Sequence, residues 1–235
     1  MEKIAVSRFV VKEFRTAEAF KTLRTNLMFS GADVKAVALT SFSAAEGKSM
    51  VSFQLAASLA QAGKQVLLVD ADLRKSVMVS RMRVRRKIEG LSHYLSGMVN
   101  ANEILYKTDI PGLYLVFAGA HVPNAAELLG NASFDKLIAA LKNTFDYVIV
   151  DAAPVGQVID CAVMASAMDG VIMVVDTTHN SFKLERRIKQ QLEKSGAKIL
   201  GVILNRVDLA EKNSYYGKAY GYSYDSGDGS SEEDN

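Results

Sequence analysis

The chain has 235 residues, a mass of 25.6 kDa, 49% hydrophobic residues and a formal net charge of +2. This composition suits one α/β domain with a sizeable core, and no apolar run reaches the roughly 20 residues that cross a bilayer, so we expect a cytoplasmic protein. The single cysteine, Cys161, excludes an internal disulfide framework and a multi-cysteine zinc site, and we expect it to be a small packing residue.

Six apolar segments of strand length alternate with segments of helical pattern. Because helices cover both faces of a parallel sheet, its strands consist almost entirely of Val, Ile and Leu, as these segments do. We therefore predict an α/β fold, a three-layer sandwich with a mainly parallel sheet, which binds ligands at the carboxyl ends of its strands. The predicted strands lie within residues 34–41, 65–72, 113–119, 147–154, 170–177 and 198–205.

Three of the intervening helices have recognisable ends. The first covers residues 48–62 and stops at Gly63. The second follows Ser133, which we expect to be its N-cap. The third follows Ser181 as N-cap and ends at Gly196, since glycine commonly terminates helices in the left-handed conformation.

Residues 40–49, TSFSAAEGKS, have the position of a phosphate-binding loop between a strand and a helix. Amides at such a helix start cradle phosphate oxygens, while Lys48 reaches the terminal phosphates and the Ser49 hydroxyl ligates Mg²⁺. Phe42 replaces the first glycine of the GxxxxGK[ST] pattern, so Gly47, Lys48 and Ser49 alone carry the match.

Three aspartates follow two other predicted strands. Asp70 and Asp72 end the second strand, and Asp151 ends the fourth. If these strands neighbour the first one, the carboxylates converge on one Mg-nucleotide, because Mg²⁺ prefers oxygen ligands and keeps several waters. A carboxylate that does not bind the metal can accept the proton of an attacking hydroxyl. Any one of these aspartates alone is more simply a cap or loop residue, which does not explain all three together.

Residues 74–87 contain seven Lys and Arg residues and no acid. This stretch can attract phosphates, anionic lipid or an acidic protein, or it is simply a solvated loop. It has no interleaved aromatic residues and matches no helix-turn-helix, RNP or zinc-finger pattern, so we expect no nucleic-acid binding.

Five tyrosines lie within ten residues near the C-terminus, behind a domain that we place at residues 1–212. The tail, residues 213–235, has one lysine, five acidic residues and no aliphatic side chain larger than alanine, so we expect it to be disordered and accessible. This arrangement indicates phosphorylation sites, with an aggregating or strand-pairing aromatic tail as the alternative. The tyrosines are Tyr215, Tyr216, Tyr220, Tyr222 and Tyr224.

These features together resemble one family, the bacterial tyrosine kinases of capsule and exopolysaccharide synthesis. The family's phosphate loop TSxxPGEGKS is similar to residues 40–49, its motif VLLVDADLRKP to residues 66–76, and its motif DYVIVDTPPVG to residues 146–156. Further family segments match residues 90–97 and 122–129. The likeness runs almost end to end, and this order of motifs is specific, whereas each motif alone is shared with other P-loop ATPases.

The resemblance implies a P-loop NTPase fold and a protein-tyrosine kinase that uses ATP and Mg²⁺, phosphorylates its tail in trans and regulates capsule or exopolysaccharide synthesis. Asp70 would accept the tyrosine proton, whereas Asp72 and Asp151 would organise the Mg²⁺ shell with Ser49. Asn205 resembles the asparagine that reads adenine in related ATPases. The residues implied to bind nucleotide are Ala45, Glu46, Gly47, Lys48, Ser49, Met50 and Asn205, and those implied in catalysis are Lys48, Asp70, Asp72 and Asp151.

The resemblance also implies partners. Family members without a membrane span are activated by a separate transmembrane protein, which would recruit this chain to the inner face of the membrane. EAFKTLRTN, residues 18–26, resembles the family's E-x-x-R-x-x-R oligomerisation helix, which implies a ring-like homo-oligomer held by Glu18, Lys21 and Arg24. A tyrosine phosphatase would reset the tail.

The sequence departs from the family pattern at several rigid or permissive positions. Alanines replace Pro-Gly at residues 44 and 45 and Thr-Pro at residues 152 and 153, and Ser76 replaces a proline. If the loop requires a positive φ at Ala45, the alanine adds strain of about 1 kcal/mol. Two alternatives stay open: a weakly active ATP-binding scaffold of polysaccharide export, and a ParA-like ATPase switch, whose signature lysine would stand at Ser43.

Overall fold

Parallel strands form the centre of the computed structural model, which describes residues 3–178, 186, 190 and 192–207. The sheet has the order β3-β4-β2-β5-β1-β6-β7, and every neighbouring pair is parallel except β3 and β4. The six predicted strands are confirmed, and the two-residue edge strand β3 was not predicted. The bounds are β1 (Ala36–Ser41), β2 (Val66–Asp70), β3 (Tyr106–Lys107), β4 (Leu113–Val116), β5 (Tyr147–Asp151), β6 (Gly170–Asp176) and β7 (Ile199–Asn205).

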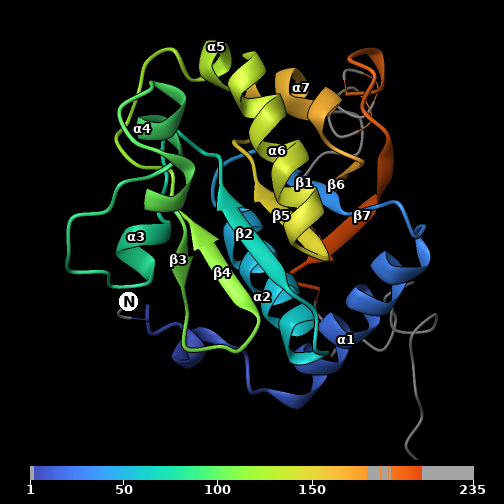
Figure 1. Cartoon of the computed structure of the whole chain (residues 1–235). Coiled ribbons are helices and arrows are strands. Elements are labelled where there is room, and N and C mark those ends of the chain that lie inside the picture. Colours follow the sequence, from blue (N-terminus) through green and yellow to red (C-terminus); the bar gives the residue numbers. More distant parts are fainter. Residues whose placement is uncertain (1–2, 179–185, 187–189, 191, 208–235) are drawn as a thin grey trace, which may run out of the picture.

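Helices cover both faces of this sheet, as the three-layer prediction requires (Figure 1). One face packs against α2, which in turn contacts α1, and the opposite face packs against α6. The described helices are η1 (Ser7–Phe9), α1 (Phe14–Phe29), α2 (Lys48–Gln61), α3 (Met78–Arg81), α4 (Leu91–Leu95), η2 (Ala101–Glu103), α5 (Ala125–Leu129), α6 (Ala132–Thr144), α7 (Asp160–Met164) and η3 (Ala165–Ala167).

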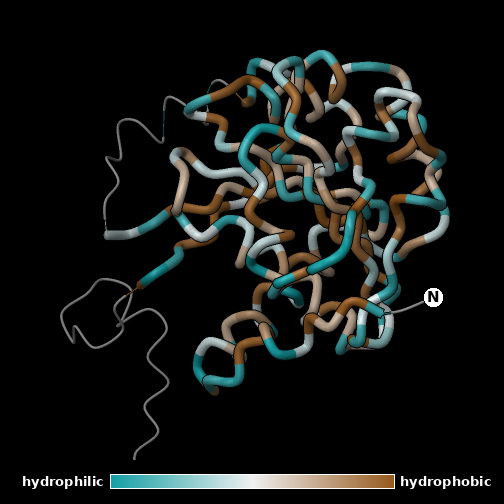
Figure 2. Tube along the Cα trace, turned by 90° about the vertical axis from the view of Figure 1, so that its left-hand side faces the viewer, coloured by the Kyte–Doolittle hydropathy of each residue, from teal (hydrophilic) through white to brown (hydrophobic). Residues whose placement is uncertain are grey.

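Each face of the sheet has its own hydrophobic core. Alternate residues of the central strands supply the two cores, so that Ala38 and Val150 lie in one, whereas Leu39 and Ile149 lie in the other. All residues of β1, β2 and β6 are buried, which explains why these strands are apolar up to the polar residues at their carboxyl ends. Figure 2 shows these hydrophobic segments running through the interior, with hydrophilic segments around the outside. Cys161 is buried in the α6-side core, as expected of a packing residue.

The predicted helix ends at Gly63 and Gly196 are confirmed, since both glycines follow helical residues and have a positive φ, and one predicted N-cap is wrong. The helix that starts at Lys48 stops before Gly63, which has φ +84°. The helix α6 is capped by Asn131, whose Oδ1 accepts hydrogen bonds of 2.9 and 3.0 Å from the amides of Ser133 and Phe134. Asn131 takes the extended conformation that an N-cap needs, so Ser133 falls inside the helix. Ser181 lies outside the described residues.

None of the helices in the described part of the chain combines the length and apolar character needed to cross a bilayer.

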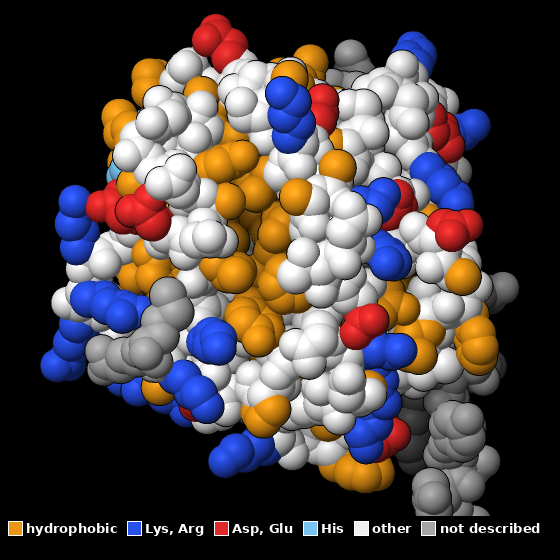
Figure 3. All heavy atoms as spheres, in the orientation of Figure 1, with side chains coloured by type: hydrophobic (Ala, Val, Ile, Leu, Met, Phe, Trp, Pro, Cys, Tyr) orange, Lys and Arg blue, Asp and Glu red, His pale blue; other side chains and the backbone are white. Residues whose placement is uncertain are grey.

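Charge on the surface is uneven. Figure 3 shows Lys and Arg side chains gathered at one edge, where α3 and the loop after it lie. This is the basic segment 74–87, in which Arg81, Arg83, Arg85, Arg86 and Lys87 are all exposed.

Candidate functional site

The loop between β1 and α2 holds two residues in the left-handed backbone region. Ala45 has φ +68°, and Gly47, the N-cap of α2, has φ +87°. The buried Glu46 carboxylate accepts hydrogen bonds of 3.1 Å from the amides of both Phe42 and Ser43, which closes the loop on itself. Because the first turn of a helix leaves its amides without intrahelical partners, the start of α2 provides donors for phosphate oxygens.

The carboxyl end of β7 holds this loop from one side. Asn205 Nδ2 donates a hydrogen bond of 2.8 Å to the Glu46 carbonyl, and Arg206 donates one of 2.8 Å to the Ala45 carbonyl. Arg206 also pairs with Asp176, a buried residue at the end of β6. Sequence reasoning missed Arg206 and Asp176, although Asp176 ends a hydrophobic strand like the predicted site aspartates. Asn205 lies against the phosphate loop, and its predicted role towards adenine stays a prediction.

Lys48 and Asp151 form a buried ion pair beneath the loop. The Nζ of Lys48 lies 2.6 Å from Oδ1 of Asp151, and side-chain exposure is 7% and 2%, respectively. Ser52, one turn along α2, donates to the same carboxylate oxygen at 3.3 Å. Since a lysine ammonium has three donors and this pair uses one, Lys48 retains donors for phosphate oxygens.

Asp70 lies beside Asp151, because β2 and β5 pair in parallel with these two residues in register. Burial and then the negative charge of Asp151 raise the pKa of Asp70 to about 7. The Ser76 hydroxyl donates to Oδ2 of Asp70, and the Asp72 amide donates a hydrogen bond of 3.2 Å to Oδ1. A carboxyl group with a pKa near neutrality is suited to accept a proton, which fits the predicted role of Asp70.

The predicted Mg²⁺ ligands provide oxygen donors of the right kind. Ser49 follows Lys48 in the first turn of α2, and Asp72 is held after β2 by a 2.9 Å hydrogen bond from the Lys75 amide. Within the residues that the structure describes, no three His, Cys, Asp or Glu side chains are grouped to hold a metal by themselves. A Mg-nucleotide site needs fewer protein ligands, because waters and phosphate oxygens complete the shell. One hydroxyl and one or two carboxylates therefore fit Mg²⁺.

A second ion pair braces the segment after β2. The Arg74 guanidinium donates hydrogen bonds of 2.7 and 3.0 Å to the two oxygens of Asp160, which is fully buried. Arg74 also donates to the Pro123 carbonyl at 3.3 Å. These contacts join the loop that carries Asp72 to α7 and to the segment before α5. Arg74 lies in the motif of residues 66–76, whereas Asp160 lies beyond the motif of residues 146–156, and their pairing across 86 positions was not predicted.

The helix predicted to form the oligomer contact is part of α1. Glu18 and Lys21 form an exposed ion pair of 2.6 Å with each other. Arg24 donates a hydrogen bond of 2.8 Å to the Ser58 carbonyl on α2. The three side chains therefore have partners within one copy, and their predicted role between copies stays a prediction.

Met50, predicted to lie near the nucleotide, is 38% exposed in the first turn of α2. The five tail tyrosines lie outside the described residues.

Residues 34–199 match the family described as an AAA domain. The chain is 45% identical over 208 residues to the tyrosine-protein kinase CpsD of Streptococcus agalactiae, covering 87% of this chain and 91% of the relative. It is 38% identical to CpsD of Streptococcus pneumoniae, over 86% of this chain and 90% of the relative.

The structure also superposes on solved structures of kinase domains. The kinase domain of VpsO superposes with a TM-score of 0.77 at 32% identity, covering 84% of this chain and 97% of that one. The kinase domain of the Escherichia coli tyrosine kinase ETK gives a TM-score of 0.77 at 32% identity, over 80% of this chain and 74% of that one. The septum site-determining protein MinD of Pyrococcus horikoshii, complexed with Mg-ADP, shares the fold at 23% identity and a TM-score of 0.64, over 76% of this chain and 73% of that one.

Proposed function

Since the chain belongs to the family of bacterial tyrosine-protein kinases of capsule and exopolysaccharide synthesis, we propose how its residues share the transfer of the γ-phosphate of ATP to tyrosine. The enzyme is a protein-tyrosine kinase on a P-loop NTPase fold. Its acceptors are the five tyrosines of its own tail, supplied by a neighbouring copy. The observation that supports this proposal is the placement of Lys48, Asp151 and Asp70 on adjacent elements at the carboxyl edge of the sheet.

In the reaction, the phenolic oxygen of tyrosine bonds to the γ-phosphorus while the bond from that phosphorus to the bridging oxygen breaks and ADP leaves. The phenolic proton passes to the Asp70 carboxylate. Tyrosine is hardly ionised near neutral pH, given its ordinary pKa of about 10, so positioning and charge neutralisation supply most of the rate. Bound Mg²⁺ would neutralise phosphate charge, with Ser49, Asp72 and Asp151 as its protein ligands.

Lys48 has two tasks in this proposal. Its ammonium offsets the charge of Asp151, and its remaining donors hold phosphate oxygens as charge accumulates on the leaving ADP. Asn205 and Arg206 keep the loop in the shape that presents the α2 amides to those oxygens. Hydrogen bonds from the carboxyl end of β7 thus fix the conformation of the loop that binds the nucleotide.

The cellular setting of the proposal comes from the family. A separate transmembrane protein activates the kinase and recruits it to the inner face of the membrane, copies assemble into a ring-like homo-oligomer, and a tyrosine phosphatase removes the phosphates. Assembly lets the tail of one copy reach the site of the next.

One experiment separates the kinase from the alternative functions. The full-length protein is incubated with Mg-ATP, and its tail is analysed by mass spectrometry beside the Lys48→Met and Asp70→Asn variants. We expect phosphotyrosine on the tail of the wild type, almost none for Lys48→Met, and a slower rate with near-normal nucleotide affinity for Asp70→Asn. A ParA-like switch would hydrolyse ATP without phosphotyrosine, and a scaffold would bind ATP and do neither. Wild-type phosphotyrosine levels in Lys48→Met would contradict the assignment.

A further inference from the structure

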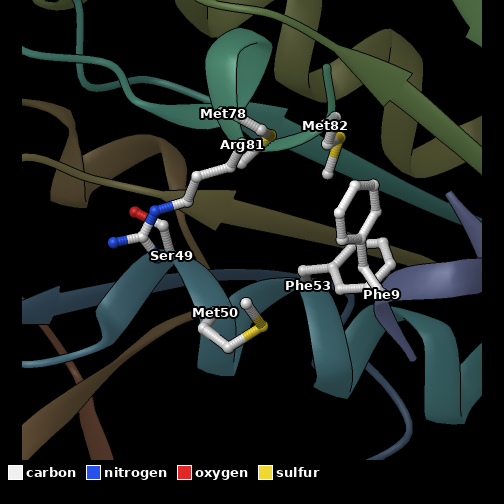
Figure 4. A pocket seen from close by; sticks show the side chains of 7 residues that line it. All are labelled: Phe9, Ser49, Met50, Phe53, Met78, Arg81 and Met82. Carbon is white, nitrogen blue, oxygen red and sulfur yellow. The ribbon is translucent and has the colours of Figure 1, made fainter. Parts of the chain in front are cut away.

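A small apolar hollow opens beside the phosphate site. Its walls come from η1, α2 and α3, which contribute Phe9, Phe53, Met78 and Met82, and Ser49 of the phosphate loop helix lies at one end. Figure 4 shows the Arg81 side chain extending from α3 towards Ser49, with the two phenylalanine rings at the other end. Any side chain that enters this hollow therefore lies next to the residue expected to hold the Mg-nucleotide.

The walls of the hollow suit an aromatic ring. Thioether sulfurs make favourable contacts with ring edges, and methionine side chains rotate about three bonds. The free volume is about 30 Å³, so a ring enters only as the methionines move aside. The phenylalanine wall is held in place, because Arg8 lies 4.8 Å from the Phe9 ring centroid and donates a hydrogen bond of 3.3 Å to the Met82 carbonyl.

Charge around the hollow favours an acidic segment. Arg81 is exposed and begins a run of basic side chains that continues through Lys87. Residues 213–235 carry one lysine against five acidic residues, so their charge is complementary to this edge of the molecule. The same 23 residues contain the five tyrosines, which supply the aromatic rings for this hollow.

Resting on the function proposed above, we propose that this hollow is an anchor subsite for a tail tyrosine of a second copy, which is not the tyrosine that reacts. Tyr220, Tyr222 and Tyr224 are spaced two residues apart. In an extended segment such residues project to the same side about 7 Å apart. With one ring in the hollow, the next tyrosine is presented towards the γ-phosphate above Ser49. The subsite thus selects clustered tyrosines over isolated ones.

Three synthetic peptides of residues 213–235 test the anchor with full-length kinase and Mg-ATP. In all three peptides Tyr222 is the only tyrosine. The other four tyrosines are replaced by alanine, except where another substitution is named below. The first peptide carries Tyr220→Phe and Tyr224→Phe, whose rings can dock but cannot be phosphorylated. The second peptide keeps alanine at both positions, so it measures the reaction without an anchor.

The third peptide controls for composition. In this peptide each phenylalanine moves one position towards the N-terminus and changes places with the residue there. The substitutions in the tail sequence are therefore Ala219→Phe, Tyr220→Ala, Ser223→Phe and Tyr224→Ser. Its two rings therefore lie at odd distances from Tyr222, where an extended segment points them to the opposite side. Charge, length and residue content are the same as in the first peptide.

We expect the first peptide to have a KM about tenfold below those of the other two, because only its rings reach the hollow in register. The Phe9→Ala variant should reduce this difference to less than about twofold while leaving the KM of the second peptide, which has no anchor ring, unchanged. Arg81→Ala should raise the KM of all three acidic peptides, and Arg85→Ala, a matched loss of charge on the same segment, should raise it less.

The outcomes separate this inference from the proposed function. Phosphorylation of all three peptides with equal KM would refute the anchor while leaving the kinase assignment intact, and so would a KM advantage that survives in Phe9→Ala. If none of the peptides is phosphorylated although ATP is consumed, Tyr222 is not an acceptor, and the anchor fails together with the assignment of this tyrosine. If Phe9→Ala does not fold, a uniform KM across the peptides in the wild type already overturns the anchor.

Discussion

Ala45→Gly should stabilise the protein, although glycine usually destabilises. Ala45 has φ +68°, where an L-residue with a side chain is strained by about 1–2 kcal/mol and glycine is not. Glycine also gives the unfolded chain more freedom, which costs about 0.4–1 kcal/mol of stability. The net gain should be about 0.5 kcal/mol, or about 2 °C in Tm for a domain of this size.

Ala44→Gly is the matched control, since Ala44 is also exposed in the same loop but does not have a positive φ. The unfolded-state penalty is then the same without relief of strain, so we expect a Tm about 2 °C below the wild type. Thermal unfolding followed by circular dichroism gives both shifts. The difference between the variants isolates the strain, at about 1–2 kcal/mol. Equal decreases in Tm for both variants would show that the loop stores no strain at Ala45.

Two further predictions concern the ion pairs outside the phosphate loop. Arg74→Ala should lower the free energy of unfolding, measured in urea, by about 3 kcal/mol, because it leaves the buried Asp160 carboxylate without its guanidinium partner. Full stability in an Arg74→Lys variant would show that the bidentate geometry is unimportant. Replacing Glu18, Lys21 and Arg24 together by alanine should shift an assembled ring to monomer in light scattering and reduce tail phosphorylation, whereas an unchanged mass would make the motif a solvated helix face.

The fold could be predicted because the central strands of its sheet are buried on both faces. Residues 147–151 and 170–176 are nearly all apolar up to a final aspartate, which fixes both the strand and the position of its carboxylate at the sheet edge. The strand β3 has only two residues and carries no such signal. The α6 cap was wrong by two positions, since Asn131 and Ser133 are both good caps and only the backbone decides between them.

The site was predictable where one motif contains the whole feature, as in Gly47-Lys48-Ser49. It was not predictable where the contact joins distant segments. Arg206 and Asp176 reach each other because β6 and β7 pair in parallel, and Arg206 then bonds to a loop 161 residues earlier. Ser76 stands where the family has a proline, and its hydroxyl donates a hydrogen bond to Asp70. No pattern of residue spacing reveals this contact.

Transfer of phosphate between copies is the central claim, and one mixing experiment tests it most directly. An active kinase with all five tail tyrosines replaced by phenylalanine is mixed with a Lys48→Met protein whose tail is intact. Tail phosphorylation of the inactive protein is then measured by mass spectrometry. We predict phosphotyrosine on the Lys48→Met tail, because its acceptors need only the active site of another copy. An unlabelled tail, under conditions where the wild type labels itself, would contradict the account.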